Sequence, residues 1–446
     1  MGEVKTNLPE TGIQNPLPFI PFLKFLIFSL IGIFMFFIPI TIGDRSSIPL
    51  DHIVTWIRST FPDLVPWYLL ITIAIGAIYP FMKGTWKTDA VTIVLTLFKV
   101  LGLFTAILVM FEWGPEWLFG ENMGPFLFNS LVASVGVLVP IGAIFLAMLT
   151  SFGLLEFVGV LMQPIMRPVW KTPGRSAIDA VASFVGSYSV GLLITNRIFK
   201  EGKYTIKEAA IIATGFSTVS VTFMLVVART LELMDLWNLY FWVTMFVTFL
   251  VTAITVRIWP LSKMSDGYYE GGEGQPEVLV KKNRLKTAWN SAIETAEKAD
   301  NNLFKLIWQN LKDGYIMTMG ILPSIMSIGL LGMILAKFTP VFDIVGYVFY
   351  PFTWILQLPD ALLAGKAAAV GIAEMFLPAV LVVNAALVTK FVIAVVCVST
   401  IIFFSATVPC ILSTSIPITL TQILVIWLER TILSIIITAP LAFLLL

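Results

Sequence analysis

The residues that could do chemistry in this chain are a few charged side chains inside long apolar stretches. Glu374 stands nine residues into a weakly polar segment that opens at Gly365, among Ala, Val, Ile and Met. A charged side chain at the centre of a bilayer costs at least about 2.5 kcal/mol, so it marks a functional site by default. Glu374 could bind a cation, carry a coupling proton, or accept from a substrate amine or hydroxyl. The alternative is a structural pair with Lys366 or a hydrogen bond to the local backbone.

Arg175 and Asp179 open a second segment of the same kind. Their spacing of four residues would form a salt bridge if the segment begins as a helix, and that bridge could be their whole role. Alternatively, Arg175 near a helix N-terminus would bind a carboxylate or phosphate, because the guanidinium and the helix dipole favour the same charge. Both interpretations are open at this point.

Neutral polar residues complete the candidate site without a charge penalty. The candidate substrate ligands are Arg175, Asp179, Ser183, Ser187, Asn196, Glu374 and Asn384, and the candidate ion ligands are Ser217, Thr218, Glu374, Ser405 and Thr407. The ion candidates lie in spans interrupted by polar residues, where unwound carbonyls can bind an alkali ion. Ordinary packing of small polar residues between helices is the alternative for each.

Other classes of chemistry lack the residues they need. His52 is the only histidine of the chain, and Cys397 and Cys410 lie in apolar segments, which indicates free thiols. We therefore expect no metal site and no cofactor beyond Na⁺ or H⁺ as a coupling ion. The sequence has no glycine-rich phosphate loop and no intramembrane dyad for hydrolysis, so we expect neither a pump nor an enzyme. A net charge of +1 argues against a nucleic-acid partner.

Membrane helices must position these residues. Hydrophobic residues make up 58% of the chain and charged residues 12%, and apolar runs of 18 or more recur along it. This predicts an all-α polytopic membrane protein with about nine transmembrane helices and two re-entrant helical hairpins. The spans are expected at 22–42, 64–82, 90–111, 127–150, 208–230, 238–258, 314–336, 391–412 and 416–440.

The segment 174–197 is expected to enter the membrane and return. Arg167 and Lys171 precede it, and Arg197 to Lys207 follow it, so a single crossing would leave one basic cluster outside. Divided at Gly186-Ser187, each arm of about ten residues spans about 15 Å, which is half a bilayer. The basic loops place both ends of this hairpin and the N-terminus in the cytoplasm. We expect a protein of the bacterial cytoplasmic (inner) membrane.

The second half of the chain repeats the first in the order of its elements. Val139-Pro140 matches Leu322-Pro323 in two spans, and Gly174 matches Gly365 at the start of two hairpins. The expected domains are an N-terminal three-helix region (1–112), a first repeat (127–260), a cytoplasmic linker with interfacial helices (261–313) and a second repeat (314–446) with hairpin 365–388. Counting spans gives the repeats inverted topology, the architecture of alternating access.

At this point the chain resembles a known family. Residues 163–177, which read QPIMRPVWKTPGRSA, with Asp179, Ser183 and Gly186-Ser187-Tyr188 after them, look like bacterial YjiH-type membrane proteins with nucleoside-recognition (Gate) domains. The resemblance covers about residues 130–445. Gate domains are similar in plan to half of a concentrative nucleoside transporter, whose first hairpin carries a Gly-x-x-Glu motif. Gly371-Ile372-Ala373-Glu374 looks like that motif but lies in the second hairpin.

The residues and the resemblance together predict an ion-coupled secondary transporter that works by alternating access. Its solute would be small and polar, such as a nucleoside, nucleobase, amino acid or organic anion, held between the two hairpins. The alternative is a partner-dependent permease subunit or a channel without independent transport. The expected partners are the solute, the lipid bilayer, and a second copy or a second Gate-type membrane protein.

Overall fold

The computed structural model describes residues 19–446 except 39, 44, 88–89, 121–122, 186 and 300–301. The predicted hairpin tip at Gly186 and the predicted cytoplasmic N-terminus lie outside the described residues. The regular structure of the described chain is helical, apart from one antiparallel ribbon of β1 (Ile40–Ile42) and β2 (Arg45–Ser47). The prediction of an all-α polytopic membrane protein is confirmed.

Seven helices of the described chain are long and apolar enough to cross a membrane. They are α1 (Phe19–Phe37), α3 (Leu64–Met82), α4 (Ala90–Met110), the continuous α5 (Gly124–Phe126) to α6 (Ala133–Thr150), α12 (Trp237–Thr255), the continuous α14 (Leu303–Ser324) to α15 (Leu330–Phe338), and α21 (Leu420–Leu445). All seven coincide with predicted spans. The span predicted at 314–336 begins earlier, at Leu303, because the second predicted interfacial helix is the first part of α14.

The other two predicted spans are each divided into two shorter helices. Span 208–230 consists of α10 (Ile206–Gly215) and α11 (Val221–Thr230), and span 391–412 consists of α19 (Leu387–Ser399) and α20 (Thr407–Leu412). The Ser220 side chain accepts a hydrogen bond from the Phe223 amide and so caps α11 as a new helix. A polar residue therefore begins the new helix at the first interruption, whereas α20 starts after Ala406 without a side-chain cap.

The two halves share one order of elements. In the first, α6 is followed by α7 (Leu154–Trp170), the hairpin arms α8 (Ser176–Val185) and α9 (Tyr188–Lys200), a broken helix and α12. In the second, α14 is followed by α16 (Val341–Ile355), the hairpin arms α17 (Ala361–Val370) and α18 (Leu377–Leu381), a broken helix and α21. Each long helix that opens a half contains a π-helical turn, η3 (Leu127–Val132) or η7 (Ile325–Gly329). The inversion of one repeat against the other stays a prediction.

A close glycine crossing recurs in the first part of each hairpin, at Gly174 just before α8 and at Gly365 inside α17, which begins four residues before the predicted start of the hairpin. A Cβ atom on Gly174 would lie 1.9 Å from the Gly159 carbonyl oxygen of α7. The equivalent atom on Gly365 would lie 2.9 Å from the Gly346 carbonyl oxygen of α16. Both connectors therefore approach their hairpins at a distance that only glycine allows, and the first crossing is the tighter.

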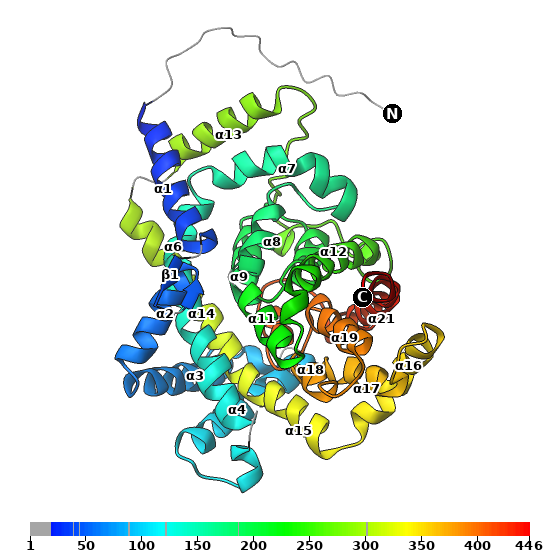
Figure 1. The fold of residues 1–446 in the computed structure, drawn as a ribbon. Coiled ribbons are helices and arrows are strands. Elements are labelled where there is room, and N and C mark those ends of the chain that lie inside the picture. Colours follow the sequence, from blue (N-terminus) through cyan, green and yellow to red (C-terminus); the bar gives the residue numbers. More distant parts are fainter. Residues whose placement is uncertain are drawn as a thin grey trace.

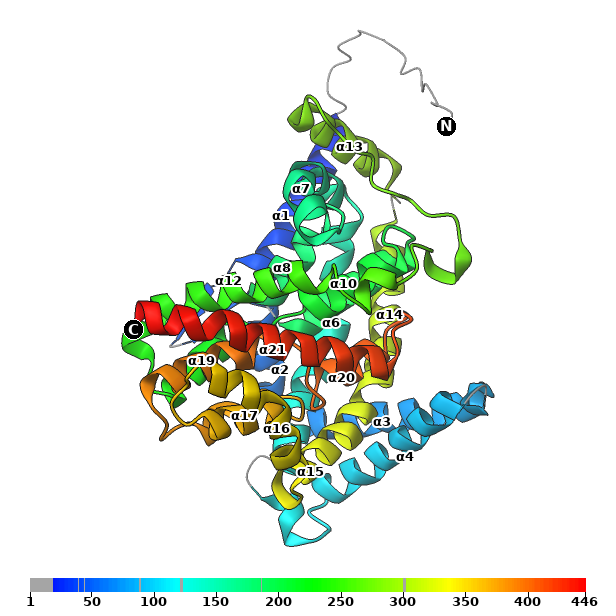
Figure 2. The same cartoon turned by 90° about the vertical axis from the view of Figure 1, so that its right-hand side faces the viewer.

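One buried arginine ties the two broken helices together. Arg430 of α21 is fully buried and donates to the carbonyl oxygens of Ser399 and Thr400 at the end of α19. It also donates to the Thr252 hydroxyl, which in turn donates to the Gly215 carbonyl oxygen at the end of α10. A guanidinium at helix C-termini satisfies carbonyls that lack helical partners and complements the helix dipole. Figure 2 shows α12 and α21 side by side around this point.

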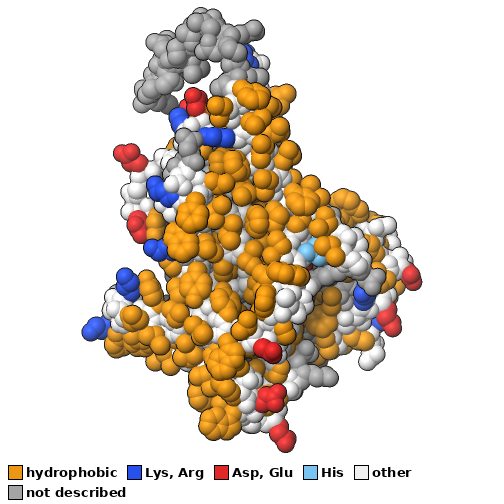
Figure 3. All heavy atoms as spheres, turned by 90° about the vertical axis from the view of Figure 1, so that its left-hand side faces the viewer, with side chains coloured by type: hydrophobic (Ala, Val, Ile, Leu, Met, Phe, Trp, Pro, Cys, Tyr) orange, Lys and Arg blue, Asp and Glu red, His pale blue; other side chains and the backbone are white. Residues whose placement is uncertain are grey.

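The N-terminal region lies beside the repeats (Figure 1) and contains one helix that was not predicted. This is α2 (Pro49–Thr60), which begins with Pro49 in its first turn and carries Asp51 there, both favourable at a helix start. Helices α3 and α4 form a pair (Figure 2). Hydrophobic side chains cover most of the face that Figure 3 displays. A broad exposed apolar surface of this kind fits contact with lipid.

The linker between the halves is packed rather than loose. Its backbone bonds to the first repeat through Ile206 N to Gly267 O and Gln275 N to Gly202 O. A helix is present in the linker as α13 (Arg284–Lys298), which packs on α1 and α7, and its place at the membrane interface stays a prediction. Domain boundaries at single residues stay predictions.

Candidate functional site

One cavity of about 470 Å³ lies where both hairpin tips and both helix interruptions meet. The first hairpin contributes Ser187, Tyr188 and Ser189, and the second contributes Glu374, Met375 and Phe376. Val219, Ser220 and Phe223 line it from the first broken helix, and Phe403 lines it from the second. The remaining wall is built by Val226 of α11, by residues of α5 to α6, and by Ser47, Ile48 and Asp51.

Glu374 occupies the tip of the second hairpin, between α17 and α18. Its side chain is buried, and its Oε2 atom accepts from the backbone amides of Phe376 and Leu377 at 2.7 and 3.1 Å. A carboxylate has about four acceptor positions, so these two bonds leave room for a ligand. The proposed structural partner, Lys366, pairs instead with Asp343 at 2.8 Å. Glu374 is therefore held by backbone alone.

The second interruption fixes the tip that carries Glu374. The backbone amides of Phe404 and Ser405 donate to the carbonyl oxygens of Ile372 and Ala373 at 2.6 and 2.9 Å. These bonds satisfy non-helical backbone that lipid could not. The hairpin tip and the broken helix consequently form one unit around the cavity.

The first hairpin presents hydroxyls and an aromatic ring to the cavity. The Ser187 and Ser189 side chains are hydrogen-bonded at 2.8 Å. The Tyr188 ring meets the Phe403 ring edge-on, with centroids 5.8 Å apart. This contact joins the tip of the first hairpin to the second broken helix.

Asp179 lies away from the cavity, fully buried between the arms of the first hairpin. It accepts hydrogen bonds from Thr195 at 2.6 Å and from Tyr204 at 2.7 Å. No salt bridge joins Asp179 to Arg175 in the described structure, because the carboxylate is turned toward α9 and the loop after it. Arg175 is buried at the start of α8, and its Nε atom has no hydrogen-bond partner among the described residues.

The other predicted substrate ligands also lie off the cavity. Ser183 packs across the arms against Gly191, where a Cβ atom would lie 1.7 Å from the Ser183 oxygen. Asn196 accepts from the Ser415 amide at 2.8 Å, and Asn384 is exposed on the second hairpin. Of the predicted substrate ligands, Ser187 and Glu374 line the cavity.

The predicted ion ligands other than Glu374 gather at the two interruptions without lining the cavity. Ser217 donates weakly to the Ile212 carbonyl at 3.4 Å, and Thr407 bonds to the backbone of Ile401 and Phe403. The buried hydroxyls of Thr218 and Ser405 have no partner among the described residues. These last two oxygens have no hydrogen bond to give up on coordinating an ion.

The sequence did not point to most of the cavity wall. Tyr188, Phe223 and Phe403 supply its aromatic surface, and Ser130 and Ser134 add hydroxyls from the long first-repeat helix. Aromatic residues next to a predicted break were a usable signal for Tyr188 and Phe403. Asp51 lines the cavity from α2, a helix that was not predicted. Pro49 and Asp51 at the helix start were the signal for it.

These features define an all-α integral membrane protein with two helical hairpins. Residues 132–234, from α6 to the loop before α12, match the Gate family, described as nucleoside recognition. The chain is 33% identical over 435 residues to an uncharacterized protein of Alkalihalophilus pseudofirmus, and 92% of each chain is covered. It therefore belongs to the same family of YjiH-like membrane proteins, as the resemblance implied. No solved structure matches the chain.

Proposed function

We propose that this protein is a secondary transporter that binds a small polar solute in the cavity between its hairpins. The observation that carries the proposal is the convergence of both hairpin tips and both helix interruptions on one cavity with Glu374 in its wall. Discontinuous helices that meet between two repeats are the usual site of substrate binding in alternating-access transporters. The cavity of about 470 Å³ is within the range of small-molecule sites.

The lining favours a neutral or cationic solute with a planar ring. Its charged side chains are Asp51 and Glu374, and the lining residues described include no Lys or Arg. Carboxylates and hydroxyls bind amines and sugar hydroxyls, while Tyr188, Phe223 and Phe403 offer aromatic surface for stacking. A nucleoside or nucleobase fits this chemistry best, an amine-bearing amino acid next, and an organic anion least.

Coupling to Na⁺ or H⁺ belongs to the same proposal. The unpartnered hydroxyls of Thr218 and Ser405 lie at the interruptions, where helix-terminal carbonyls are also available. Protonation of Glu374 is the other route, since the cavity can exchange a proton with solvent when it opens. Transport measured with and without a sodium gradient separates the two.

The proposed membrane is the bacterial cytoplasmic membrane, with the linker on the cytoplasmic side. Basic residues gather there in ion pairs: Arg167 with Glu277, Arg197 with Asp313, and Lys203 with Glu156. An excess of such residues near helix ends is typical of cytoplasmic loops.

The test is a ligand screen followed by transport. Purified protein is unfolded thermally in the presence of nucleosides, nucleobases, amino acids and organic anions, and stabilising solutes are then tested for uptake into proteoliposomes. We expect a nucleoside or nucleobase to stabilise the wild type and the Asp343→Asn control, and not Glu374→Gln. Stabilisation that survives Glu374→Gln would refute the site. Uptake that requires a second membrane protein would instead favour the permease-subunit alternative.

A further inference from the structure

Lys99 places an ammonium group in the middle of a membrane-spanning helix. It belongs to α4, within the apolar window Ile93–Met110. Leu97 and Leu101 of the same helix are exposed on the outer surface, whereas Thr96 and Lys99, three residues apart, face inward. Lys99 therefore points toward the protein interior rather than toward lipid.

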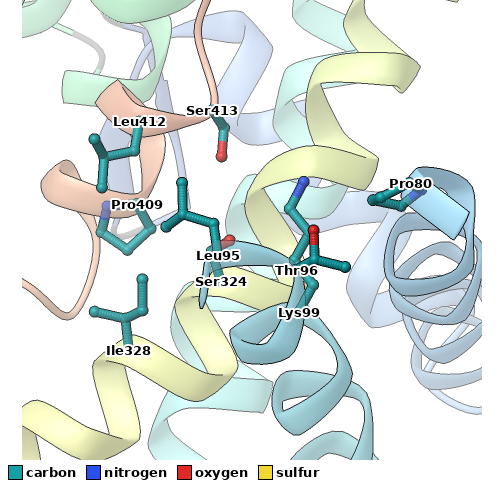
Figure 4. A pocket seen from close by; sticks show the side chains of 9 residues that line it. All are labelled: Pro80, Leu95, Thr96, Lys99, Ser324, Ile328, Pro409, Leu412 and Ser413. Carbon is teal, nitrogen blue, oxygen red and sulfur yellow. The ribbon is translucent and has the colours of Figure 1, made fainter. Parts of the chain in front are cut away.

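Its side chain lines a cavity of about 150 Å³ that is separate from the substrate cavity and shares no lining residue with it. The walls come from four places in the chain, represented by Pro80 of α3, Thr96 of α4, Ser324 at the end of α14, and Ser413 after α20. Figure 4 shows the Lys99 nitrogen and the Ser413 oxygen turned toward the same space. The cavity is built by groups distant in sequence.

No carboxylate neutralises this ammonium group. Lys99 has no hydrogen bond or ion pair with any described residue, and the residues that line the cavity include no Asp or Glu. The Ser413 hydroxyl likewise donates to no described residue, whereas Ser324 donates to the Gly320 carbonyl. Intramembrane lysines are normally paired or face a water-filled cavity, because an isolated charge there is costly.

We propose that this cavity binds a small monovalent anion, a halide or a short carboxylate, with Lys99 as its counter-ion and Ser413 as a hydrogen-bond donor. A water needs about 10 to 15 Å³ by the same kind of measure, so the cavity has room for such an anion with some of its hydration. The bound anion would link the N-terminal pair α3 and α4 to Ser413 at the end of the second broken helix. It would thereby stabilise one position of α20.

The experiment compares anions at one ionic strength. Thermal unfolding of the purified full-length protein is measured in sodium bromide, sodium acetate and sodium gluconate, the last being too large for the cavity. Laurate at micromolar concentration forms a separate arm that reports a lipid-derived carboxylate. The variants are Lys99→Met, Lys99→Arg and, as a matched surface control, Lys83→Met.

We expect bromide or acetate to raise the unfolding temperature of the wild type by a few degrees over gluconate, as for a ligand present well above its Kd. Lys83→Met and Lys99→Arg should keep the difference, and Lys99→Met should lose it. A difference for laurate alone, lost in Lys99→Met, would assign the anion to a lipid source. Equal unfolding in all salts for the wild type, or a difference retained in Lys99→Met, would overturn the proposal.

Discussion

The two hairpins share a plan and use their carboxylates in opposite ways. In the first, Asp179 lies between the arms and is bonded by Thr195 and Tyr204, out of reach of the cavity. In the second, Glu374 lies at the tip, bonded only by backbone amides and in contact with the cavity. The depth of a carboxylate in a hairpin therefore decides whether it braces the two arms or faces the cavity.

The hairpins also differ in what holds them from outside. The linker crosses the first, where Glu277 accepts from the Gly174 amide at 2.9 Å and pairs with Arg167 at 3.0 Å. The second is held near its outer ends by the Lys366–Asp343 pair and by the Ala386 amide, which donates to Asp360. The linker therefore holds the first hairpin at its start, whereas the second hairpin is held by side chains near its outer ends and by the broken helix at its tip.

The largest expected effect separates the two carboxylates by function. Glu374→Gln should lower transport efficiency about 10- to 100-fold, since a charged hydrogen bond contributes about 1.5 to 3 kcal/mol. Asp179→Asn should leave transport per folded molecule within about threefold. Initial uptake rates in proteoliposomes, normalised to inserted protein, measure both. Equal losses of uptake rate in the two variants would show that Asp179 and Glu374 do not differ in their role in transport.

For the free energy of unfolding we expect the opposite order, with the larger loss in the Asp179 variant. Asp179→Ala leaves the buried Tyr204 hydroxyl without its acceptor, whereas the Thr195 hydroxyl keeps the Gly191 carbonyl oxygen. The substitution should destabilise the protein by about 1 to 3 kcal/mol. Glu374→Ala frees the part-buried amides of Phe376 and Leu377 beside the cavity, where water can replace the carboxylate, and should cost less. Thermal unfolding in detergent compares the two, with Tyr204→Phe as an intermediate control. A smaller loss for Asp179→Ala than for Glu374→Ala would contradict the bracing role.

Replacing each crossing glycine by alanine adds one methyl group, so the two crossings can be compared directly. Gly174→Ala would place Cβ 1.9 Å from a backbone oxygen, and Gly365→Ala would place it 2.9 Å from one. Overpacking of this kind costs about 1 to 3 kcal/mol, and the shorter approach should lie at the upper end. Expression level and unfolding temperature of the two variants are the readouts. A more damaging Gly365→Ala would mean that the second crossing is the more constrained.

The smallest expected effect concerns the linker. Glu277→Ala should loosen the linker where it crosses the first hairpin, at a cost of about 1 kcal/mol, because the Gly174 amide loses its charged acceptor. Hydrogen exchange should become faster in residues 264–283 and at the start of α8, while the second hairpin is unchanged. The exposed Glu273→Ala is the control. Unchanged hydrogen exchange in Glu277→Ala would show that the backbone hydrogen bonds of the linker hold it in place.

Part of the site was predictable because lipid makes polar residues conspicuous. Glu374 and Ser187 stood out in apolar sequence, and both line the cavity. Arg175, Asp179 and Asn196 stood out for the same reason, yet they bond within the hairpin or to the loop at Ser415. A carboxylate that braces two arms and one that faces a ligand look alike in sequence, since both avoid lipid.

The sequence by itself determined the membrane class, the long spans, the paired hairpins and the equivalent order of elements in both halves. Hydrophobic runs and prolines act locally, so their consequences can be calculated along the chain. Only the tertiary structure decided which polar groups meet. The contact of Tyr188 with Phe403, the capping of α19 by Arg430 and the cavity at Lys99 join residues that are far apart in sequence. Their chemistry depends on distances of a few ångströms that helix packing alone sets.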